Sequence, residues 1–285
     1  MDSIDERIDQ VLASGEKISP MDKVLLARHL SRPKINEYID ALFTDFFEQK
    51  GDRLGKEDAS IFGGIALFHG MPVTVLGHRK GSDLNESVKY NFGMPGPEGY
   101  RKALRMMEQA EKFGRPIITF IDTPGAYPGI EAEMYGQSQA IAENLAVMSR
   151  LKVPVISIVT GEGSSGGALA IGVANRVFML ENAVYSILSP EGFASILWQD
   201  SSKKEQASKL MKLTAEDLFG FGVIDGIVNE PAGGVHRNPK AVYDALDRLL
   251  TQELKTLKGK SSSELAKSRY QKFRKMDDLY LRTDK

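Results

Sequence analysis

A stretch of glycine and serine directly after an apolar segment constrains the fold more than any other feature of the chain. Residues 153–160 are mostly apolar, and residues 161–168 read GEGSSGGA. The pattern predicts a strand over 155–159, a glycine loop, and a helix over 168–173. The first N–H groups of a helix have no partner within the helix and lie at the positive end of its dipole, so such a loop can receive negative charge.

A second strand followed by a loop of the same type lies upstream. Residues 117–121 are mostly apolar and precede the loop 122–129, which reads DTPGAYPG. Strands that alternate with helices form parallel sheets, and ligands bind at the carboxyl ends of the strands in such sheets. Because both loops follow strands in this way, we expect them to form one site.

Four interpretations of the first glycine loop stay open, whereas a phosphate-binding P-loop is excluded because no lysine follows the glycine pair. A dinucleotide site would use the spacing of Gly161, Gly163 and Gly166 with Glu181 as its acidic residue, although this pattern is common in unrelated proteins. An oxyanion hole would use backbone N–H groups without any side-chain nucleophile. In a third interpretation the glycines only permit a tight turn and close helix packing.

The fourth interpretation is a serine hydrolase. Residues 163–167 read GSSGG, which satisfies the Gly-x-Ser-x-Gly pattern of a nucleophile turn and makes Ser165 the candidate nucleophile. Asp225 and His236 follow in the chain order that α/β-hydrolases use. Against this, His236 lies just before an expected helix, where a polar residue is more often a cap or a surface group.

Five segments carry a resemblance to a known family. The chain is similar to the carboxyltransferase alpha subunits of bacterial-type, multi-subunit acetyl-CoA carboxylases, and the similarity extends from about Leu26 to about Lys258. The segments that carry it are 91–105 (NFGMPGPEGYRKALR), 118–129 (ITFIDTPGAYPG), 161–172, 189–198 (SPEGFASILW) and 233–239 (GGVHRNP).

This resemblance implies an α/β, crotonase-like fold with repeated ββα units, an N-terminal helical arm and C-terminal helices. The corresponding division is an arm at 1–55, a carboxyltransferase domain at 56–258 and a helical tail at 259–285. It also implies transfer of a carboxyl group from carboxybiotin to acetyl-CoA, which gives malonyl-CoA for fatty acid synthesis. The implied partners are a carboxyltransferase beta subunit in an alpha2beta2 assembly, a biotin carboxyl carrier protein, and biotin carboxylase.

The resemblance also implies roles for individual residues. The backbone N–H groups of Gly166 and Gly167 would act as oxyanion donors to biotin, and Gly125 and Ala126 would form a second donor loop. Binding contacts to biotin are implied for Gly163, Ser165 and Tyr127. Backbone donors can stabilise the negative charge left on the ureido oxygen when carboxybiotin loses carbon dioxide, so no side-chain base is required.

Composition and charge exclude several other classes of protein. With 285 residues and 42% hydrophobic content, the chain can bury a sizeable core in one large domain or two small ones. Its formal net charge of −1 argues against general nucleic-acid binding. It has no apolar stretch of about 18 residues, and its first residues carry both signs of charge. We therefore expect no membrane span, no secretory signal and a cytoplasmic location.

The residues show no metal-binding pattern. The chain has no cysteine, and its four histidines are scattered without metal-ligand spacing, so we expect no metal in this chain. Basic groups at 78–80, at Lys89 and at 101–102 either reach the anionic parts of coenzyme A or form solvated surface. The four histidines are His29, His69, His78 and His236.

The spacing of apolar residues predicts the remaining elements. Apolar positions in the first 50 residues recur at helical spacing as far as Phe47, which predicts helices that form a packing arm. A change to strand pattern predicts a β-hairpin over 61–77 with a turn at 69–72. We further expect helices over 98–113 and 131–150, a strand over 176–180, a helix capped by Ser189, and two amphipathic helices between 240 and 274, linked at 261–263.

Overall fold

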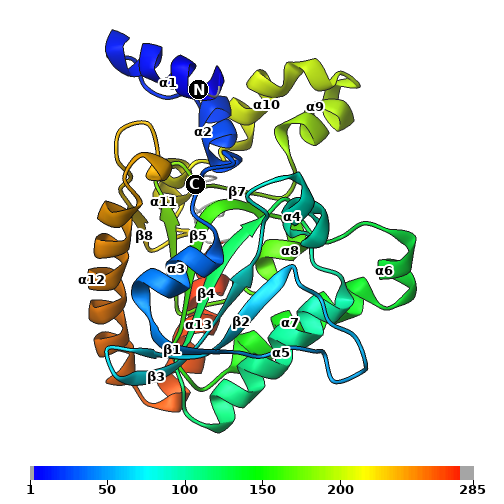
Figure 1. The fold of residues 1–285 in the computed structure, drawn as a ribbon, viewed down its shortest axis with the longest axis vertical. Coiled ribbons are helices and arrows are strands. Elements are labelled where there is room, and N and C mark those ends of the chain that lie inside the picture. Colours follow the sequence, from blue (N-terminus) through cyan, green and yellow to red (C-terminus); the bar gives the residue numbers. More distant parts are fainter. Residues whose placement is uncertain (1–2, 277–285) are drawn as a thin grey trace, which may run out of the picture.

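The fold is built around one sheet of eight strands (Figure 1). The computed structural model describes residues 3–276, and in this part of the chain no helix is long and apolar enough to cross a membrane. The strand order is β1-β2-β3-β4-β5-β6-β8, and β7 pairs with β5. The β1–β2 and β2–β3 pairs are antiparallel and the other strand pairs are parallel. The strands are β1 Thr44–Glu48, β2 Ile61–Phe68, β3 Met71–His78, β4 Ile117–Thr123, β5 Val155–Ser164, β6 Arg176–Leu180, β7 Val184–Ser186 and β8 Gly226–Val228.

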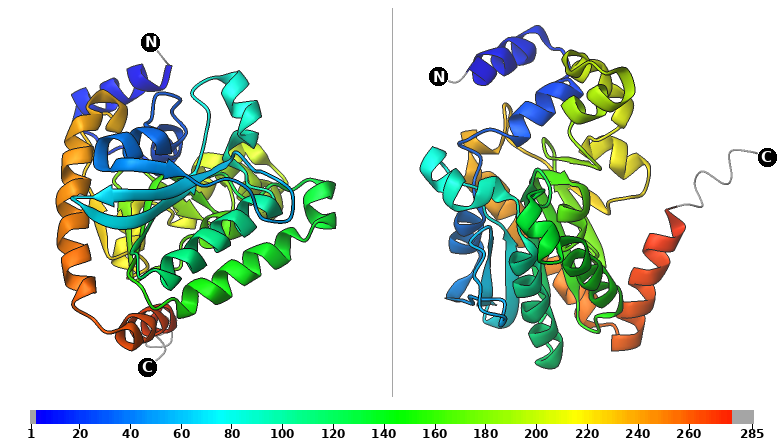
Figure 2. Two further views of the ribbon diagram at one scale, coloured as in Figure 1. Left: turned by 60° about the horizontal axis from the view of Figure 1, so that its bottom comes forward. Right: turned by 90° about the vertical axis from the view of Figure 1, so that its right-hand side faces the viewer.

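Helices cover both faces of this sheet, which is why every residue of β4 and β5 is buried (Figure 2). Helices α5 and α7 pack side by side on one face, whereas α3 and α12 lie on the other. The helices are α1 Ser3–Ser14, α2 Pro20–Ala27, α3 Ile35–Leu42, α4 Leu84–Lys89, α5 Pro97–Lys112, α6 Ile130–Met134, α7 Gln137–Arg150, α8 Ser165–Leu169, α9 Pro190–Trp198, α10 Lys204–Met211, α11 Ala215–Gly220, α12 Pro239–Lys258 and α13 Ser262–Lys275, with short 3₁₀ turns η1 Asn91–Gly93, η2 Ser201–Lys203 and η3 Val235–Arg237.

Several predicted elements are confirmed. The hairpin β2–β3 turns through His69 and Gly70, whose φ angles of 48° and 76° are those of a tight two-residue hairpin turn. Helix α9 begins after Ser189, whose side chain accepts a hydrogen bond from the Gly192 N–H. The two C-terminal helices are also present, and Ser261 caps the second of them. The ββα order occurs at β2–β3–α4 and again at β6–β7–α9.

Two predicted helices are wrong in part, for different reasons. The helical region predicted as far as Phe47 extends too far along the chain. Phe46 and Phe47 lie in strand β1, which pairs with β2 and packs Phe46 against Phe62. The helix predicted over 131–150 is two helices. Gly136 interrupts it with a φ of 83°, a left-handed conformation that glycine adopts without steric cost.

The predicted glycine loop is also shorter than expected. Residues 161–164 continue strand β5, because Glu162 to Ser164 pair with β7 and Gly163 pairs with Thr123 of β4. Helix α8 therefore begins at Ser165 instead of Ala168, and the chain passes directly from strand to helix. We call this junction between β5 and α8, residues 164–168, the glycine turn.

The N-terminal helices lie at the same end of the sheet as the glycine turn. Helix α2 contacts β5, β7 and α10, and α1 packs on α2. Figure 1 shows α1, α2, α9 and α10 gathered at this end, away from the hairpin. Strand β1 and helix α3, although within the predicted arm, join the sheet and its core. The division at residues 55 and 258 stays a prediction, and residues 277–285 of the predicted tail lie outside the described residues.

Candidate active site

The glycine turn combines a strained residue with small neighbours. Ser165 has a φ of 56°, a left-handed conformation that is uncommon outside glycine and clusters at functional sites. Ser165 is exposed, Gly166 is half-buried and Gly167 is buried. Gly166 and Gly167 lie in the first turn of α8, where N–H groups have no partner within the helix. The turn therefore presents backbone donors beside an exposed surface.

The two predicted loops meet at Gly167. A Cβ on Gly167 would lie 2.7 Å from the Ala126 nitrogen and 2.7 Å from the Gly125 carbonyl carbon, closer than real Cβ atoms approach other atoms. The expectation that both loops lie together is therefore confirmed. Within the second loop, the Gly125 N–H donates to the Thr123 hydroxyl at 3.0 Å, and that hydroxyl donates to the Gly125 carbonyl at 2.7 Å. This pairing occupies the Gly125 N–H and makes Ala126 the better placed donor of its loop.

The other predicted contact residues are spread over different surroundings. Ser165 lines a cavity of about 280 Å³ whose walls are mainly apolar and include Leu169 and Tyr185. Gly163 is buried, because Tyr185 packs against it and would lie 3.0 Å from a Cβ at this position. Tyr127 lines a separate pocket, together with Lys56, Glu98 and other residues. Among the predicted residues, the structure brings Gly167 into contact with Gly125 and Ala126, with Gly166 and Ser165 adjacent along the chain.

A group of charges around the buried carboxylates of Asp122 and Glu162 holds the end of β5, and it was not found from the sequence. The Lys80 ammonium lies 2.7 Å from the Asp122 carboxylate and 2.8 Å from that of Glu162, and the Arg28 Nε lies 2.7 Å from Glu162. Burial raises the pKa of Glu162, but the charges of Lys80 and Arg28 outweigh this and hold its pKa at about 2. A sequence signal did exist, because Asp122 and Glu162 lie near the carboxyl ends of strands β4 and β5, and Lys80 lies just beyond the carboxyl end of the neighbouring strand β3.

The basic groups considered for coenzyme A are largely engaged within the protein. Lys80 pairs with Asp122 and Glu162 in the charge group just described. The Lys102 ammonium is also buried and donates to the Ile61 carbonyl at 2.6 Å, in addition to its ion pair with Glu57. Arg101 lies 3.3 Å from Asp52. These contacts favour structural roles for Lys80, Arg101 and Lys102.

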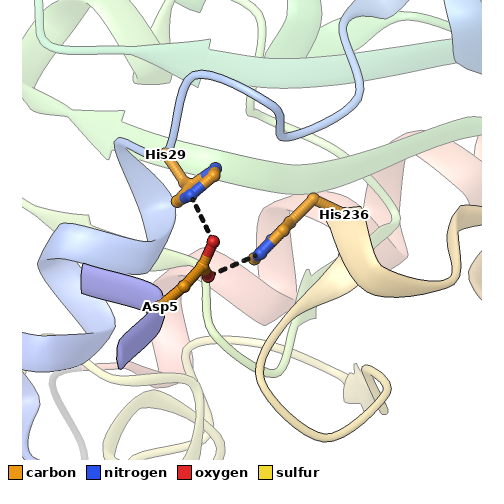
Figure 3. Close-up of side chains that lie close together, drawn as sticks. All are labelled: Asp5, His29 and His236. Carbon is orange, nitrogen blue, oxygen red and sulfur yellow. Dashed lines mark hydrogen bonds and ion pairs between the residues drawn. The ribbon is translucent and has the colours of Figure 1, made fainter. Parts of the chain in front are cut away.

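The serine hydrolase interpretation is wrong, because its other two members are held elsewhere. The Nε2 of His236 lies 3.0 Å from the Asp5 carboxylate (Figure 3). The Nδ1 of His236 is buried and has no hydrogen-bond partner. The Asp225 carboxylate accepts the Val177 N–H at 2.7 Å and pairs with Lys272. Neither residue forms a contact with Ser165 that would make a triad.

Two histidines that are distant in the sequence stack on each other beside Asp5. The His29 and His236 rings are 4.1 Å apart and nearly parallel, and both face the Asp5 carboxylate (Figure 3). Such a set could hold a metal ion. However, the Ser31 N–H donates to Nδ1 of His29, which places the proton of a neutral His29 on Nε2, the nitrogen that faces Asp5.

These contacts fasten α1 to the core. Burial raises the pKa of Asp5, but the hydrogen bond from His236 and the nearby charges of His236, His29 and Arg237 outweigh it and hold its pKa below the usual value. Arg237 extends the attachment along the same helix, because its guanidinium lies 2.8 Å from Asp9. The cluster thus joins the start of the chain to the η3 turn through hydrogen bonds and ion pairs.

His78 makes the free energy of unfolding depend on pH. This histidine ends β3 and is buried; burial lowers its pKa from 6.5 to about 3, although Asp122 and the Gly167 backbone act in the opposite direction. Between about pH 6.5 and pH 3, His78 is protonated in the unfolded chain but neutral in the folded chain. Its contribution to the free energy of unfolding is therefore fully present above about pH 6.5 and is lost as the pH falls toward 3, by up to about 1.4 kcal/mol per pH unit. We expect His78→Gln to flatten this decline.

The measurement is the free energy of unfolding by urea between about pH 6.5 and pH 5, above the range in which most carboxylates titrate. His69→Gln, which removes an exposed histidine paired with Asp247, serves as the control and is expected to keep the wild-type decline. An equal slope in wild type and His78→Gln would contradict the prediction. The test compares the slopes of the free energy of unfolding against pH. A loss of stability that is equal at every pH therefore does not affect it.

Comparison with known proteins places this chain in a family. Residues 1–277 match the model of the "Acetyl co-enzyme A carboxylase carboxyltransferase-like" family. The chain is 54% identical over 265 residues to the acetyl-coenzyme A carboxylase carboxyl transferase subunit alpha of Clostridium acetobutylicum, covering 93% of this chain and 97% of that protein. It is 53% identical over 276 residues to the same subunit of Listeria monocytogenes, covering 95% of this chain and 87% of that protein.

Solved structures share the fold at low sequence identity. A Pseudomonas malonate decarboxylase hetero-tetramer in complex with coenzyme A contains a chain with a TM-score of 0.67 and 18% identity, and the match covers 90% of this chain and 97% of that one. Transcarboxylase 12S matches with a TM-score of 0.64 and 18% identity over 83% of this chain and 45% of that one. The predicted crotonase-like α/β fold is thereby confirmed. With a family model that spans nearly its whole length and relatives above 50% identity, the chain belongs to the acetyl-coenzyme A carboxylase carboxyltransferase family.

Proposed function

We propose that this chain is the alpha subunit of an acetyl-CoA carboxyltransferase and transfers a carboxyl group from carboxybiotin, held on a separate carrier protein, to acetyl-CoA. The product is malonyl-CoA, the precursor for fatty acid synthesis. The observation that carries the proposal is the contact between Gly167 and the Gly125–Ala126 loop, which brings two backbone segments to one point. The relatives named above support the assignment of the reaction.

The residues present fit a planar, polar ring carried on an aliphatic chain. A Cβ on Gly125 would meet no atom within 4 Å, so the space in front of this loop is open. The mainly apolar cavity beside Ser165 suits the aliphatic part of such a group. Carboxybiotin supplies an activated carboxyl group when it is bound.

The chain's own contribution is a set of fixed backbone donors. We assign this role to the N–H groups of Gly166, Gly167 and Ala126, which would stabilise negative charge on the ureido oxygen of the bound ring as the charge develops. In other enzymes a single donor of this type contributes about 3 to 4 kcal/mol to the barrier. Because these donors belong to a turn held from both sides, they need little rearrangement during the reaction.

The proposed reaction needs partners that this chain does not supply. We propose a beta subunit that holds the acyl-CoA in an alpha2beta2 assembly, together with a biotin carboxyl carrier protein and biotin carboxylase, in the cytoplasm. The name alpha subunit in the relatives and the hetero-oligomeric malonate decarboxylase support a multi-subunit complex. Large exposed apolar side chains on α6 and α9 also support a docking surface; they include Ile130, Met134 and Ile196.

The test is malonyl-CoA formation from acetyl-CoA and carboxybiotin by this chain alone and by its mixture with the beta subunit. We expect activity only in the mixture, since each chain provides part of the site. Ser165→Ala is expected to keep a large part of the activity, because the reaction needs no side-chain nucleophile. A mixture that assembles but forms no malonyl-CoA would refute the proposed function.

A further inference from the structure

One arginine of the N-terminal arm links the strand of the glycine turn to helix α9. The Arg28 Nε donates to the Glu162 carboxylate at 2.7 Å, and its Nη1 donates to the Glu191 carboxylate at 3.0 Å. Arg28 caps the carboxyl end of α2, Glu162 lies in β5, and Glu191 lies in the first turn of α9. A single guanidinium thus joins α2 to β5 and to α9, across sequence separations of 134 and 163 residues.

The backbone at the end of β5 pairs with β4 at Gly163 and with β7 from Glu162 to Ser164, so the contact with Arg28 acts on the buried carboxylate of Glu162. The Glu162 N–H donates to the Asp122 carboxylate at 2.9 Å, and Lys80 pairs with one Glu162 oxygen at 2.8 Å. Arg28 pairs with the other oxygen, so the two cations hold the carboxylate between them. Without Arg28, this buried oxygen loses its charged partner, and the side chain is free to turn toward Lys80.

Glu162 is close enough along the chain to transmit that change to the donors. It precedes Ser165 by three residues and Gly167 by five, and Gly163 and Ser164, which lie between Glu162 and Ser165, pair with β7. Gly167 fits against Ala126 without space for one additional carbon atom, so a small shift of the strand end alters this contact. Misplacement by about 1 Å can reduce an enzymatic rate about 100-fold.

We propose that Arg28 is a positioning residue for carboxyl transfer, which it supports by holding Glu162 and Glu191 at fixed distances from the glycine turn. Through Arg28, the carboxyl end of helix α2 therefore has a positioning role in addition to its packing role. This inference rests on the proposed function. It predicts a lower kcat, with substrate affinity retained, because Arg28 acts on the placement of the donors and not on the acyl-CoA.

The experiment uses the assembled complex with the beta subunit and the reverse reaction, with malonyl-CoA and free biotin as substrates. For Arg28→Gln we expect kcat to fall about 10- to 100-fold, with the KM for malonyl-CoA changed by less than about twofold. Arg28→Lys keeps the charge but cannot bridge two carboxylates with a rigid fork, so it should restore only part of the rate. Arg7→Gln, which removes an ion pair with Asp22 in the same arm, is the matched control and should keep the wild-type kcat.

The outcomes separate the inference from the proposed function. If the wild-type complex is active and Arg28→Gln has the same kcat, the inference is wrong and the proposed function stands. If the wild-type complex shows no transfer, both are wrong. Should Arg28→Gln fail to assemble, Glu191→Gln provides the test at a half-buried position, with an expected loss in kcat of about threefold to tenfold. An unchanged kcat in that variant would overturn the inference.

Discussion

Gly167→Ala is expected to abolish most carboxyl transfer, with a loss of about 100- to 1000-fold in kcat, the range measured when one oxyanion donor is removed from other enzymes. The added Cβ would lie 2.7 Å from the Ala126 nitrogen, so the glycine turn and the second loop must move apart. That movement displaces the donors of both segments at once. The measurement is malonyl-CoA formation by the complex with the beta subunit.

Gly166→Ala is the matched control for this prediction. A Cβ at Gly166 would lie 3.5 Å from the nearest atoms, those of Ile141, which is an ordinary van der Waals contact, and the backbone N–H is kept. We therefore expect a far smaller loss of kcat than for Gly167→Ala. Both variants must assemble with the beta subunit, as judged by size-exclusion chromatography. Equal activities in the two variants would show that the contact between Gly167 and Ala126 does not govern transfer.

Lys80→Met is expected to lower the free energy of unfolding by about 3 to 5 kcal/mol, because it removes the cation from a buried ion pair and leaves its partners uncompensated. Lys80 contacts Asp122 and Glu162 at 2.7 and 2.8 Å, and its side chain is only 16% exposed. Burial lowers the pKa of Lys80, but the two carboxylates outweigh burial and raise its pKa above the usual value. The lysine thus stays charged in the folded chain, and methionine fills its volume without its charge.

The measurement is urea unfolding at neutral pH, with Lys240→Met as the control. Lys240 also pairs with a carboxylate, that of Asp244, but its side chain is 80% exposed. Exposed pairs of this kind contribute about 0.3 to 0.5 kcal/mol, so the control should change stability little. A loss in Lys80→Met no larger than that of the control would mean that water or a rearranged Arg28 compensates for the missing ammonium.

The strand and helix pattern was readable from the sequence wherever the signal is local. The hairpin β2–β3, the cap at Ser189 and the two C-terminal helices follow from spacing, turn residues and capping residues that lie within a few positions of one another. The prediction failed where a distant segment decides the structure. Phe46 and Phe47 have helical spacing, yet strand β2 offers an edge with which residues 44–48 form hydrogen bonds.

The sequence by itself determined that a glycine-rich junction follows a buried strand and that the chain belongs among carboxyltransferases, since both depend on consecutive residues. Only the tertiary structure decided that Gly167 touches Ala126, that Lys80 pairs with two carboxylates instead of facing a ligand, and that Arg28 reaches Glu162. Each of these contacts joins residues at least 40 positions apart. Their energies come from close packing and from charges paired away from water, which exist only after the chain has folded.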